Sequence, residues 1–544
     1  MKLLKKMSAT VLGIILSISL ITGCSSTTKE NSKSSKKDIT LCESWNFDTG
    51  FFTVLSPNNI GSNYGPLNYL CNFYETLVQY EDGEIVPGLA KDWEISDDGL
   101  VYTFNLKKDI KFSDGEYFNA KVVKLNLDNI PKMLGDFNGA YGATTTLIKE
   151  VKVVDEYTVE VNLSSPYYGA LQDFTLLLPM GMMSPNAYNE DGTLSEMTKI
   201  KTLGTGPYMY DGQKDGESYV FVRNNEYNRK QPDVESFSVK VIPDNDAKIL
   251  ALRSGEIDAI IGSPNISYDS FNELSSDDKY KVKVSDAIVQ TRLIGFNLSE
   301  KPFEEKAVRL AINHGINKDE ISENLFYGIE QKADGVLDKS LPYCDVTVEQ
   351  YEYDPEKAIQ ILEDAGWIDS DRDGIREKDG MRLEGEIVYI SGMAMIEDLS
   401  LSVAHYLKAI GMDVKVKGME MMAQFGVIAS GDFTMAMQVT NPIPYDPYLF
   451  MTRVNPDPLR DNLLAQGLKH IDNASEILNE LTCMTDKSKI QETYDFVLKE
   501  INKNGAIIPL TKVKSLGVFN EEVIEDYKFF GHPDLPNVAN IRLK

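Results

Sequence analysis

Three aspartates alternate in the segment DSDRDGIREKDG, which begins at Asp369. Asp369, Asp371 and Asp373 take the first, third and fifth positions of a calcium-binding loop, and Gly374 takes the sixth. The twelfth position is Gly380, where such a loop needs a bidentate glutamate, and no pair of helices is evident around it. We therefore interpret the segment as a solvated turn, and calcium binding is the alternative.

Sequence motifs of common catalytic sites are missing. The chain contains no GxSxG, no HExxH and no GxxxxGK[ST], which would place a nucleophile, a pair of zinc ligands or a phosphate-binding loop. Its 83 Asp and Glu residues leave room for a paired acid/base site, so a secreted glycosidase is the enzyme-class alternative. We predict a protein that is not an enzyme and has no catalytic residues.

A rigid aromatic loop stands out in VTNPIPYDPYLF, Val439 to Phe450. Proline fixes φ and removes a backbone donor, so the predicted strand FTMAMQV must end before this run. Loops of this kind, placed on a rigid scaffold, often carry binding residues. Tyr445 is the candidate wall of a binding pocket, and the alternative is that its ring only packs its own loop.

The elements that must position this loop alternate between short strands and helices from Asp38 onward. VYTFNLKKDIKFSDG and VKVVDEYTVEVNL alternate apolar and polar residues around turn residues, as hairpins do. DNDAKILALRSGEID predicts a helix capped by Asp244 and ended by Gly255, and DPEKAIQILEDAGW predicts one ended by Gly366. The pattern predicts an α/β fold with mixed sheets.

Length, charge and cysteine content narrow the class. A chain of 544 residues is too long for a single core. The net charge of -28 makes nucleic acid an unsuitable partner. Cys42, Cys71, Cys344 and Cys483 have no metal-ligand spacing. Free buried thiols are expected for them, with a disulfide as the alternative.

The N-terminus predicts export. MKLLKKMS carries three lysines, an apolar run ATVLGIILSISLIT follows, and GC comes next, which is the order of a secretory signal. The run is short for a membrane span of about 20 residues, and an uncleaved anchor is the alternative. LITGCS resembles a bacterial lipobox, which implies cleavage before Cys24 and diacylation of its thiol. Two lipid chains would hold the protein stably on the outer side of the cell membrane.

Ordered segments along the rest of the chain carry a family resemblance. They include YETLVQYEDGEIVPGLAKDWEISDDGLVYTFNLKKDIKFSDGEYFNA, LGTGPYMY, VKVIPDNDAKILALRSGEIDAI, LIGFNLSEKPFEEKAVRLAINHGINKDEI, YDPEKAIQILEDAGW, DGIREKDG and IIPL. In this order and spacing the chain resembles the extracellular solute-binding proteins of ABC importers, family 5, which bind nickel, peptides and opines. The resemblance covers residues 39 to 544.

This resemblance implies a two-lobed, periplasmic-binding-protein-like fold of type II, in the large family-5 variety with an extra subdomain. The ligand would lie in the cleft between the lobes, which would close by a hinge motion before docking on a membrane permease. The implied division is a signal peptide 1–23, a lipid-anchored linker 24–37, lobe I over 38–287 plus 510–544, and lobe II over 288–509. Crossovers are expected near DAIVQTRLIGFN and NGAIIPL, and a monomer is expected.

The loop after Val439 is closest in pattern to the nickel-binding members, which have Thr-Trp-Gly-x-Pro-Tyr-Asp-Pro. Tyr445 matches a pocket tyrosine of that pattern, and Asn441 replaces a pocket tryptophan. In peptide-binding members an aspartate that pairs with the peptide ammonium falls at Ile443, which cannot make this contact. The resemblance therefore implies nickel, or another transition metal, bound as a complex with a small chelator. An oligopeptide or dipeptide ligand is the alternative.

In the nickel-binding members, arginines that grip a carboxylate of the ligand stand at the positions that Leu178 and Gly181 take in this chain. Contacts with a charged ligand must therefore come from other residues here. Arg292, in VQTRLIGFN, is the first replacement, since an arginine at the crossover can grip a carboxylate bidentately. Its alternative role is an interlobe salt bridge. Arg453 is the second replacement.

Metal ligands are left unassigned in this prediction. The histidines are expected to be satisfied or at the surface, and a chelator can saturate the metal by itself. No cofactor is predicted, because any metal would be the transported ligand. The four histidines are His314, His405, His470 and His532.

Three further pocket candidates come from irregular, aromatic runs. Tyr64 and Asn68 lie in SNYGPLNYL, which matches a region that lines the cleft in the family. Tyr141 lies in the glycine-rich NGAYGATT. We expect all three side chains to face the ligand.

Overall fold

The computed structural model describes residues 37–47, 50–52, 65–214, 216, 218–393, 395–457 and 461–544. Residues 36–544 form one compact unit. The signal peptide, Cys24, most of the linker and Tyr64 lie outside the described residues. Within the described part, no helix combines the length and apolar character that a membrane span needs.

One mixed sheet of 11 strands runs through the described chain, in the order β17-β16-β18-β12-β19-β11-β1-β10-β9-β8, with β13 paired to β19. β1 pairs in parallel with β10 and β11, and β16 pairs in parallel with β17 and β18. The other pairs are antiparallel, which confirms the predicted mixed sheet. The strands are β1 (Asp38–Glu43), β8 (Tyr208–Lys214), β9 (Ser218–Arg223), β10 (Ser236–Val241), β11 (Ala259–Ile261), β12 (Tyr280–Phe296), β13 (Gln331–Lys332), β16 (Glu384–Ile390), β17 (Asp413–Met419), β18 (Met435–Val439) and β19 (Ile507–Asn520).

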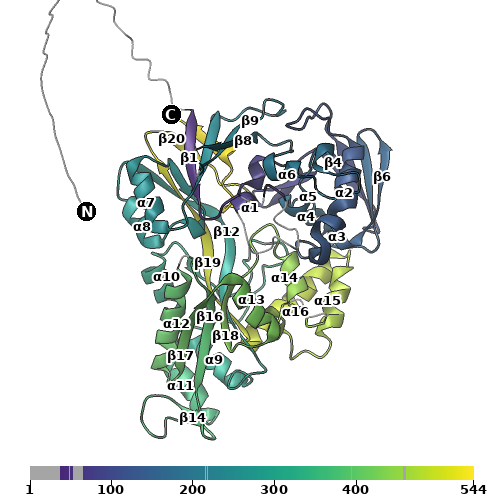
Figure 1. The fold of residues 1–544 in the computed structure, drawn as a ribbon. Coiled ribbons are helices and arrows are strands. Elements are labelled where there is room, and N and C mark those ends of the chain that lie inside the picture. Colours follow the sequence, from purple (N-terminus) through teal and green to yellow (C-terminus); the bar gives the residue numbers. More distant parts are fainter. Residues whose placement is uncertain are drawn as a thin grey trace, which may run out of the picture. The chain divides into compact units, whose positions relative to one another are not determined.

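Two long strands form the middle of this sheet. β12 and β19 pair from Tyr280–Asn520 to Gly295–Ile507, with three register shifts between Val284 and Leu293. In Figure 1 they run between the strands around β1 and those around β16. Register shifts bend a strand and re-aim its side chains, and these fall within the predicted crossover. The division into lobes at 287/288 and 509/510 stays a prediction.

A second sheet has the order β4-β5-β7-β6 and is covered by α2 (Ala120–Leu134). β6 and β7 form the hairpin predicted from VKVVDEYTVEVNL. The hairpin predicted from VYTFNLKKDIKFSDG is wrong, because its first strand, β5, pairs with β4 and β7 instead of with the residues after the turn. The turn at Asp114 closes only an isolated bridge between Lys111 and Tyr117. The strands are β4 (Ala90–Ile95), β5 (Val101–Leu106), β6 (Ile148–Asp155) and β7 (Thr158–Leu163).

Helix boundaries follow the predicted caps. In α7 (Asn245–Ser254) the side chain of Asp244 accepts from the backbone N–H of Ala247, and Gly255 ends the helix with φ +76°. That left-handed conformation is accessible to glycine without strain. In α11 (Pro355–Asp364) Asp354 caps the first turn in the same way, and Gly366 follows the last turn with φ +89°.

The remaining elements are short strands and helices around the two sheets. The short strands are β2 (Val78–Glu81), β3 (Glu84–Pro87), β14 (Glu377–Lys378), β15 (Met381–Arg382), β20 (Ile524–Tyr527) and β21 (Ile541–Leu543). The helices are α1 (Gly65–Tyr69), α3 (Thr144–Leu147), α4 (Ala170–Asp173), α5 (Leu177–Met180), α6 (Met197–Ile200), α8 (Tyr268–Leu274), α9 (Lys306–Gly315), α10 (Lys318–Leu325), α12 (Ile396–Ala409), α13 (Met421–Ser430), α14 (Tyr448–Arg453), α15 (Ala474–Thr482) and α16 (Lys487–Asn504).

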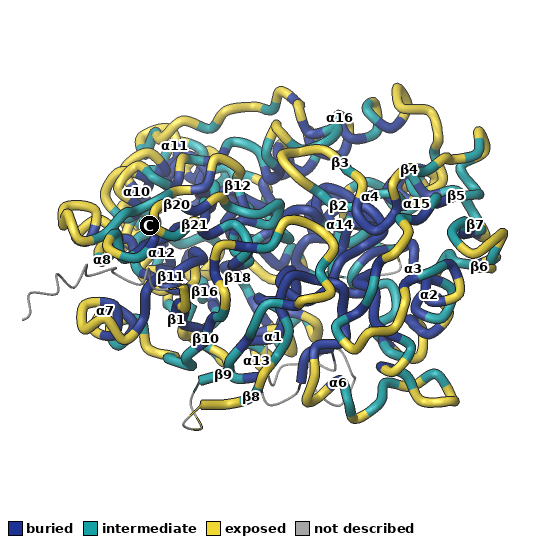
Figure 2. Tube along the Cα trace, turned by 90° about the horizontal axis from the view of Figure 1, so that it is seen from above, coloured by how far each residue is buried: buried dark blue, intermediate teal, exposed yellow. Residues whose placement is uncertain are grey.

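Aromatic rings make up much of the buried core. The ring of Phe221 stacks on Phe73 at 4.9 Å and on Phe237 at 4.8 Å, which adds to the stabilisation from burial alone. Figure 2 shows buried chain through the interior and exposed chain at the periphery. The four cysteines of the described residues are free, which confirms the expectation of free thiols. Three of them are buried as expected, whereas Cys483 is exposed.

Candidate functional site

The aromatic loop Thr440–Pro447 joins β18 to α14 and is fastened to β12. The N–H of Thr440 donates to Thr291 O at 2.9 Å, and the N–H of Thr291 donates to Thr440 Oγ1 at 3.0 Å. Farther along, the N–H of Ile443 donates to Val289 O at 3.2 Å. The loop is therefore bound to the stretch of β12 where its register shifts.

A buried carboxyl fixes the inner shape of the loop. Asp446 Oδ1 accepts from Asn441 Nδ2 at 2.9 Å and from the N–H of Phe450 at 3.1 Å. Burial raises the pKa of Asp446 to about 7, although the Asn441 hydrogen bond and the charge of Arg453 oppose the shift. Asn441 Oδ1 in turn accepts from Arg453 Nη1 at 2.7 Å, and Arg453 also donates to Asp461.

These contacts bring two predicted ligand residues together, Asn441 and Arg453. Arg453 lines a hollow of about 350 Å³ beside α13, with Gln438 and Phe425 also on its wall. Asn441 instead lines a different hollow, beside β12. Their shared hydrogen bond holds the loop, and a ligand contact by either residue stays a prediction.

Tyr445 meets a segment far away in the sequence. Its ring centre lies 6.5 Å from that of Tyr141, and its hydroxyl donates to Leu178 O at 3.5 Å. Gln172 Nε2 donates to Pro444 O at 3.0 Å. The structure thus brings together two of the three predicted pocket tyrosines, and it places Leu178 beside them.

Two adjoining hollows flank the loop. The first, which we call the Tyr445 cavity, is about 220 Å³ and is lined by Pro444 and Tyr445. The second, the β12 cavity, is about 1010 Å³ and is lined by Asn441 and Ile443. Residues of both walls are Tyr80, Asp82, Lys528, Phe529, Phe530 and Gly531.

A charged pair on the wall of the Tyr445 cavity was not foreseen. Arg229 Nη2 lies 3.0 Å from Glu75 Oε1, and Glu75 Oε2 accepts from Thr205 Oγ1 at 2.9 Å. Burial raises the pKa of Glu75, and the charge of Arg229 opposes this shift. Arg229 lies in NNEYNRKQPD, which is polar like any exposed turn, so no local signal marks it.

The histidines divide into two groups. His314 Nδ1 lies 2.9 Å from Glu352 O, His470 Nδ1 lies 2.7 Å from Asn504 Nδ2, and His405 is exposed on α12. These three fit the prediction. His532 differs, because it lines the Tyr445 cavity and its buried Nδ1 has no hydrogen-bond partner among the described residues.

Arg292 is buried against Glu330 in this structure, and a ligand contact by Arg292 stays a prediction. Its side chain is 5% exposed and is fully engaged by Glu330, with Nε 3.0 Å from Oε2 and Nη2 2.9 Å from Oε1. Successive residues of a strand face opposite sides, so Thr291 reaches the β12 cavity and Arg292 points away from it. The salt bridge that Arg292 makes with Glu330 also does not join two lobes, because both residues fall in the predicted lobe II.

Asn68 makes a supporting contact with a buried carboxyl, and its predicted contact with the ligand stays a prediction. Its Nδ2 donates to Glu43 Oε2 at 2.9 Å, at the end of β1. Glu43 is buried, and burial raises the pKa of its carboxyl, with the Asn68 hydrogen bond opposing the shift. Asn68 therefore stabilises a buried polar group in this structure.

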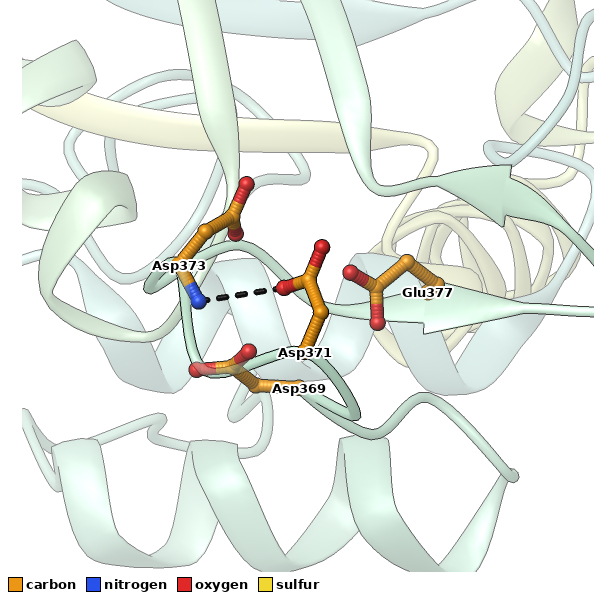
Figure 3. Close-up of side chains that lie close together, drawn as sticks. All are labelled: Asp369, Asp371, Asp373 and Glu377. Atoms are coloured by element: carbon orange, nitrogen blue, oxygen red, sulfur yellow. Dashed lines mark hydrogen bonds between the residues drawn. The ribbon is translucent and has the colours of Figure 1, made fainter.

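The acidic turn gains a fourth carboxylate. Asp369, Asp371, Asp373 and Glu377 bring one oxygen each within 4.8 Å of one another (Figure 3). Protein donors serve part of the cluster, as the N–H of Gly374 donates to Asp369 Oδ2 at 3.1 Å and Arg382 Nη1 donates to Asp373 at 2.8 Å. Asp369 Oδ1 and Glu377 Oε1 are buried and have no hydrogen-bond partner among the described residues. These donors fit the solvated turn, and calcium binding stays a prediction.

Comparison with known proteins assigns the family. Residues 84–457 match the model of the bacterial extracellular solute-binding proteins, family 5 middle. The chain belongs to this family. It is 31% identical over 478 residues, 85% of this chain and 89% of the relative, to the nickel-binding periplasmic protein of Escherichia coli K12.

Two further relatives of this family-5 chain are named for different ligands. The oligopeptide-binding protein AppA of Bacillus subtilis is 25% identical over 83% of this chain and 82% of its own length. The crystal structure of NikA from Brucella suis in complex with Fe(III)-EDTA superposes with a TM-score of 0.83 and 30% identity, over 93% of this chain and 100% of that one. The predicted family and fold class are confirmed, and the family is one of solute binding.

Proposed function

We propose that this protein captures nickel, or another transition metal, as a complex with a small chelator and delivers it to the permease of an ABC importer. One observation carries the proposal. The Tyr445 cavity combines an aromatic wall, the guanidinium of Arg229 and the imidazole of His532, whose buried Nδ1 has no hydrogen-bond partner among the described residues. The relatives named for nickel binding and for an Fe(III)-EDTA complex support it.

The cavity chemistry suits a compact anionic chelate. The ring of Tyr445 offers an apolar face, and the five N–H groups of a guanidinium leave Arg229 donors for a carboxylate beyond its contacts with Glu75 and Gln79. The hollow of about 220 Å³ favours a small ligand. Arg229 therefore takes the carboxylate-binding role for which Arg292 is unsuited.

An oligopeptide is the second candidate ligand. The adjoining β12 cavity of about 1010 Å³ gives an extended ligand room, and Asp286 on its wall can meet an ammonium group. The Bacillus subtilis relative is named for oligopeptide binding. Against this, Ile443 stands where peptide-binding members have their ammonium-pairing aspartate.

Titration calorimetry separates the two ligand classes. We expect tight binding of nickel mixed with L-histidine, weak or no binding of nickel alone, and no heat from tri- to pentapeptides. A chelate presents carboxylates and an apolar surface that the bare ion lacks. Tight peptide binding without heat from any metal complex would contradict the metal proposal and favour the second candidate.

We further infer that the mature protein is a monomer held outside the cytoplasm by lipid on Cys24. Replacing Cys24 with alanine is expected to move nearly all of the protein from the membrane fraction to the soluble fraction, because two acyl chains supply the attachment. Immunoblotting of both fractions measures this. Cys483→Ala is the matched control, since Cys483 is exposed and lies outside the signal. A Cys24→Ala protein that stays with the membrane would exclude the anchor.

The proposed metal is cargo, and no cofactor is needed.

A further inference from the structure

One buried side chain joins two stretches of the wall of the Tyr445 cavity. Residues 175–177 form one stretch, and Pro444 with Tyr445 forms another. Gln172 lies in α4, just before the first stretch, and is 5% exposed. Its Nε2 donates to Pro444 O at 3.0 Å, across 272 positions of the sequence. This hydrogen bond therefore reaches from one stretch of the wall to the other.

The backbone of Gln172 is fastened to the first stretch. Its carbonyl oxygen accepts from the N–H of Thr175 at 2.9 Å and from Thr175 Oγ1 at 2.7 Å. Gln172 is thus held through its carbonyl on one side and through its amide on the other. Because the two stretches are distant in the sequence, no short piece of backbone fixes their separation, and a contact between them must do so.

A second contact between the same segments is weaker. The hydroxyl of Tyr445 donates to Leu178 O at 3.5 Å, which is longer than usual for an O–H donor. The bond from Gln172 has the ordinary length for an N–H donor. It is also buried, and a buried carbonyl that loses its donor keeps the full cost of desolvation. Of the two contacts, the amide of Gln172 therefore holds the loop more firmly.

The ring of Tyr445 has a further support beside it. The ring of Tyr141 lies 6.5 Å away, in a turn that Asp173 anchors. Asp173 Oδ2 accepts from the N–H of Thr144 at 2.9 Å, and a Cβ on Gly142 would lie only 2.7 Å from that oxygen. Adjacent residues of α4 therefore fix the backbone before Tyr445 and the ring next to it.

We propose that Gln172 is a positioning residue that sets the width of the Tyr445 cavity and thereby selects compact chelates over larger ones. It acts through Tyr445 and need not touch the ligand. A binding wall gains affinity and selectivity when its position is fixed before the ligand arrives. The inference rests on the proposed function, because it takes a metal chelate as the ligand of this cavity of about 220 Å³.

Calorimetry with two nickel chelates of different size tests this. Nickel mixed with L-histidine is the compact chelate, and nickel–diethylenetriaminepentaacetate is the larger one. Gln172→Leu removes the amide donor at similar volume, so the wall at Tyr445 loses its fixed position. The variant is expected to bind nickel–histidine about fivefold or more weakly, and the larger chelate within about twofold of the wild type. Gln172→Asn, one methylene too short for the contact, is expected to give the same fall in selectivity.

A double-mutant cycle shows whether Gln172 acts through Tyr445. In a Tyr445→Ala protein, the further change Gln172→Leu is expected to alter the affinity for nickel–histidine by less than about twofold, because the ring that Gln172 positions is gone. Losses of affinity that simply add up would overturn the positioning role.

A matched amide elsewhere separates position from stability. Gln424 is buried, its Nε2 donates to Val388 O at 3.1 Å and to Met437 O at 3.2 Å, and it is not one of the residues that line the Tyr445 cavity. Gln424→Leu is expected to lower the thermal midpoint as Gln172→Leu does, with the selectivity between the chelates unchanged. Gln172 variants that keep the wild-type selectivity, or an equal change at Gln424, would overturn the inference while leaving metal capture intact. A wild-type protein that binds neither chelate would overturn the proposed function as well.

Discussion

Replacing Glu330 with alanine is expected to lower the free energy of unfolding by about 3–5 kcal/mol, the usual cost of leaving a buried charge unpaired. Glu330 is fully buried and pairs with Arg292 at 2.9 Å. It also accepts from the hydroxyls of Tyr268 and Thr511, each at 2.5 Å. The substitution therefore strands a guanidinium and two hydroxyl groups in the core. Urea unfolding measures the change.

A surface pair gives the matched control. Glu273 is 66% exposed and pairs with Arg253, so Glu273→Ala is expected to cost less than about 1 kcal/mol. Glu330→Gln keeps an acceptor but loses the charge, and we expect an intermediate loss. Equal unfolding midpoints for Glu330→Ala and Glu273→Ala would mean that the Arg292 pair is not buried as the structure has it.

Replacing Asp446 with asparagine is expected to remove a pH dependence worth about 4 kcal/mol, from a pKa raised by burial from 3.8 to about 7. Below pH 3.8 the carboxyl is protonated in the folded and unfolded chains alike. As the pH rises to about 7, the unfolded chain releases this proton and the folded chain keeps it. The contribution of Asp446 to stability is therefore greatest in acid and is lost as the pH rises through about 7.

Urea unfolding at several pH values from about 4 to about 8 measures this difference between Asp446→Asn and the wild type. The variant is expected to gain stability over the wild type as the pH rises. The groups facing Asp446 are Asn441, Phe450 N–H, Arg453 and the thiol of Cys344. The same urea series on Asp173→Asn gives a variant for comparison with Asp446→Asn, because burial also raises the pKa of Asp173 to about 7. A constant difference across the series would mean that Asp446 is ionised in the folded protein.

Both predictions concern buried carboxyl groups that support the residues of the candidate site without lining its cavities. Glu330 fixes Arg292 on the face of β12 that points away from the β12 cavity, and Asp446 fixes the loop that carries Tyr445. Buried polar groups stabilise one arrangement best when each of their atoms is satisfied; both oxygens of Glu330 are hydrogen-bonded, whereas Asp446 Oδ2 has no hydrogen-bond partner among the described residues. Loss of the Glu330 carboxylate is therefore expected to loosen the β12 side of the candidate site as well as the fold.

Local patterns in the sequence were enough to predict much of the fold. The alternation in VKVVDEYTVEVNL produced the β6–β7 hairpin, and Asp244 and Gly255 bound α7 as predicted. These features depend on residues a few positions apart, whose periodicity and capping chemistry act before any distant contact forms. The order of such segments also identified the family, and the prolines marked the loop that carries Tyr445.

Tertiary structure alone decided which side chains meet. Tyr141 and Tyr445 come into contact across about 300 residues, Arg229 and His532 line the same cavity, and Arg292 turns to Glu330. In the sequence Arg229 sits in an ordinary polar turn, His532 sits in the Gly- and Pro-containing segment FFGHPDLP, and Arg292 looks like a free charge on a strand. The partner of a charge or an imidazole depends on which distant segment packs against it, and only the folded chain brings those segments together.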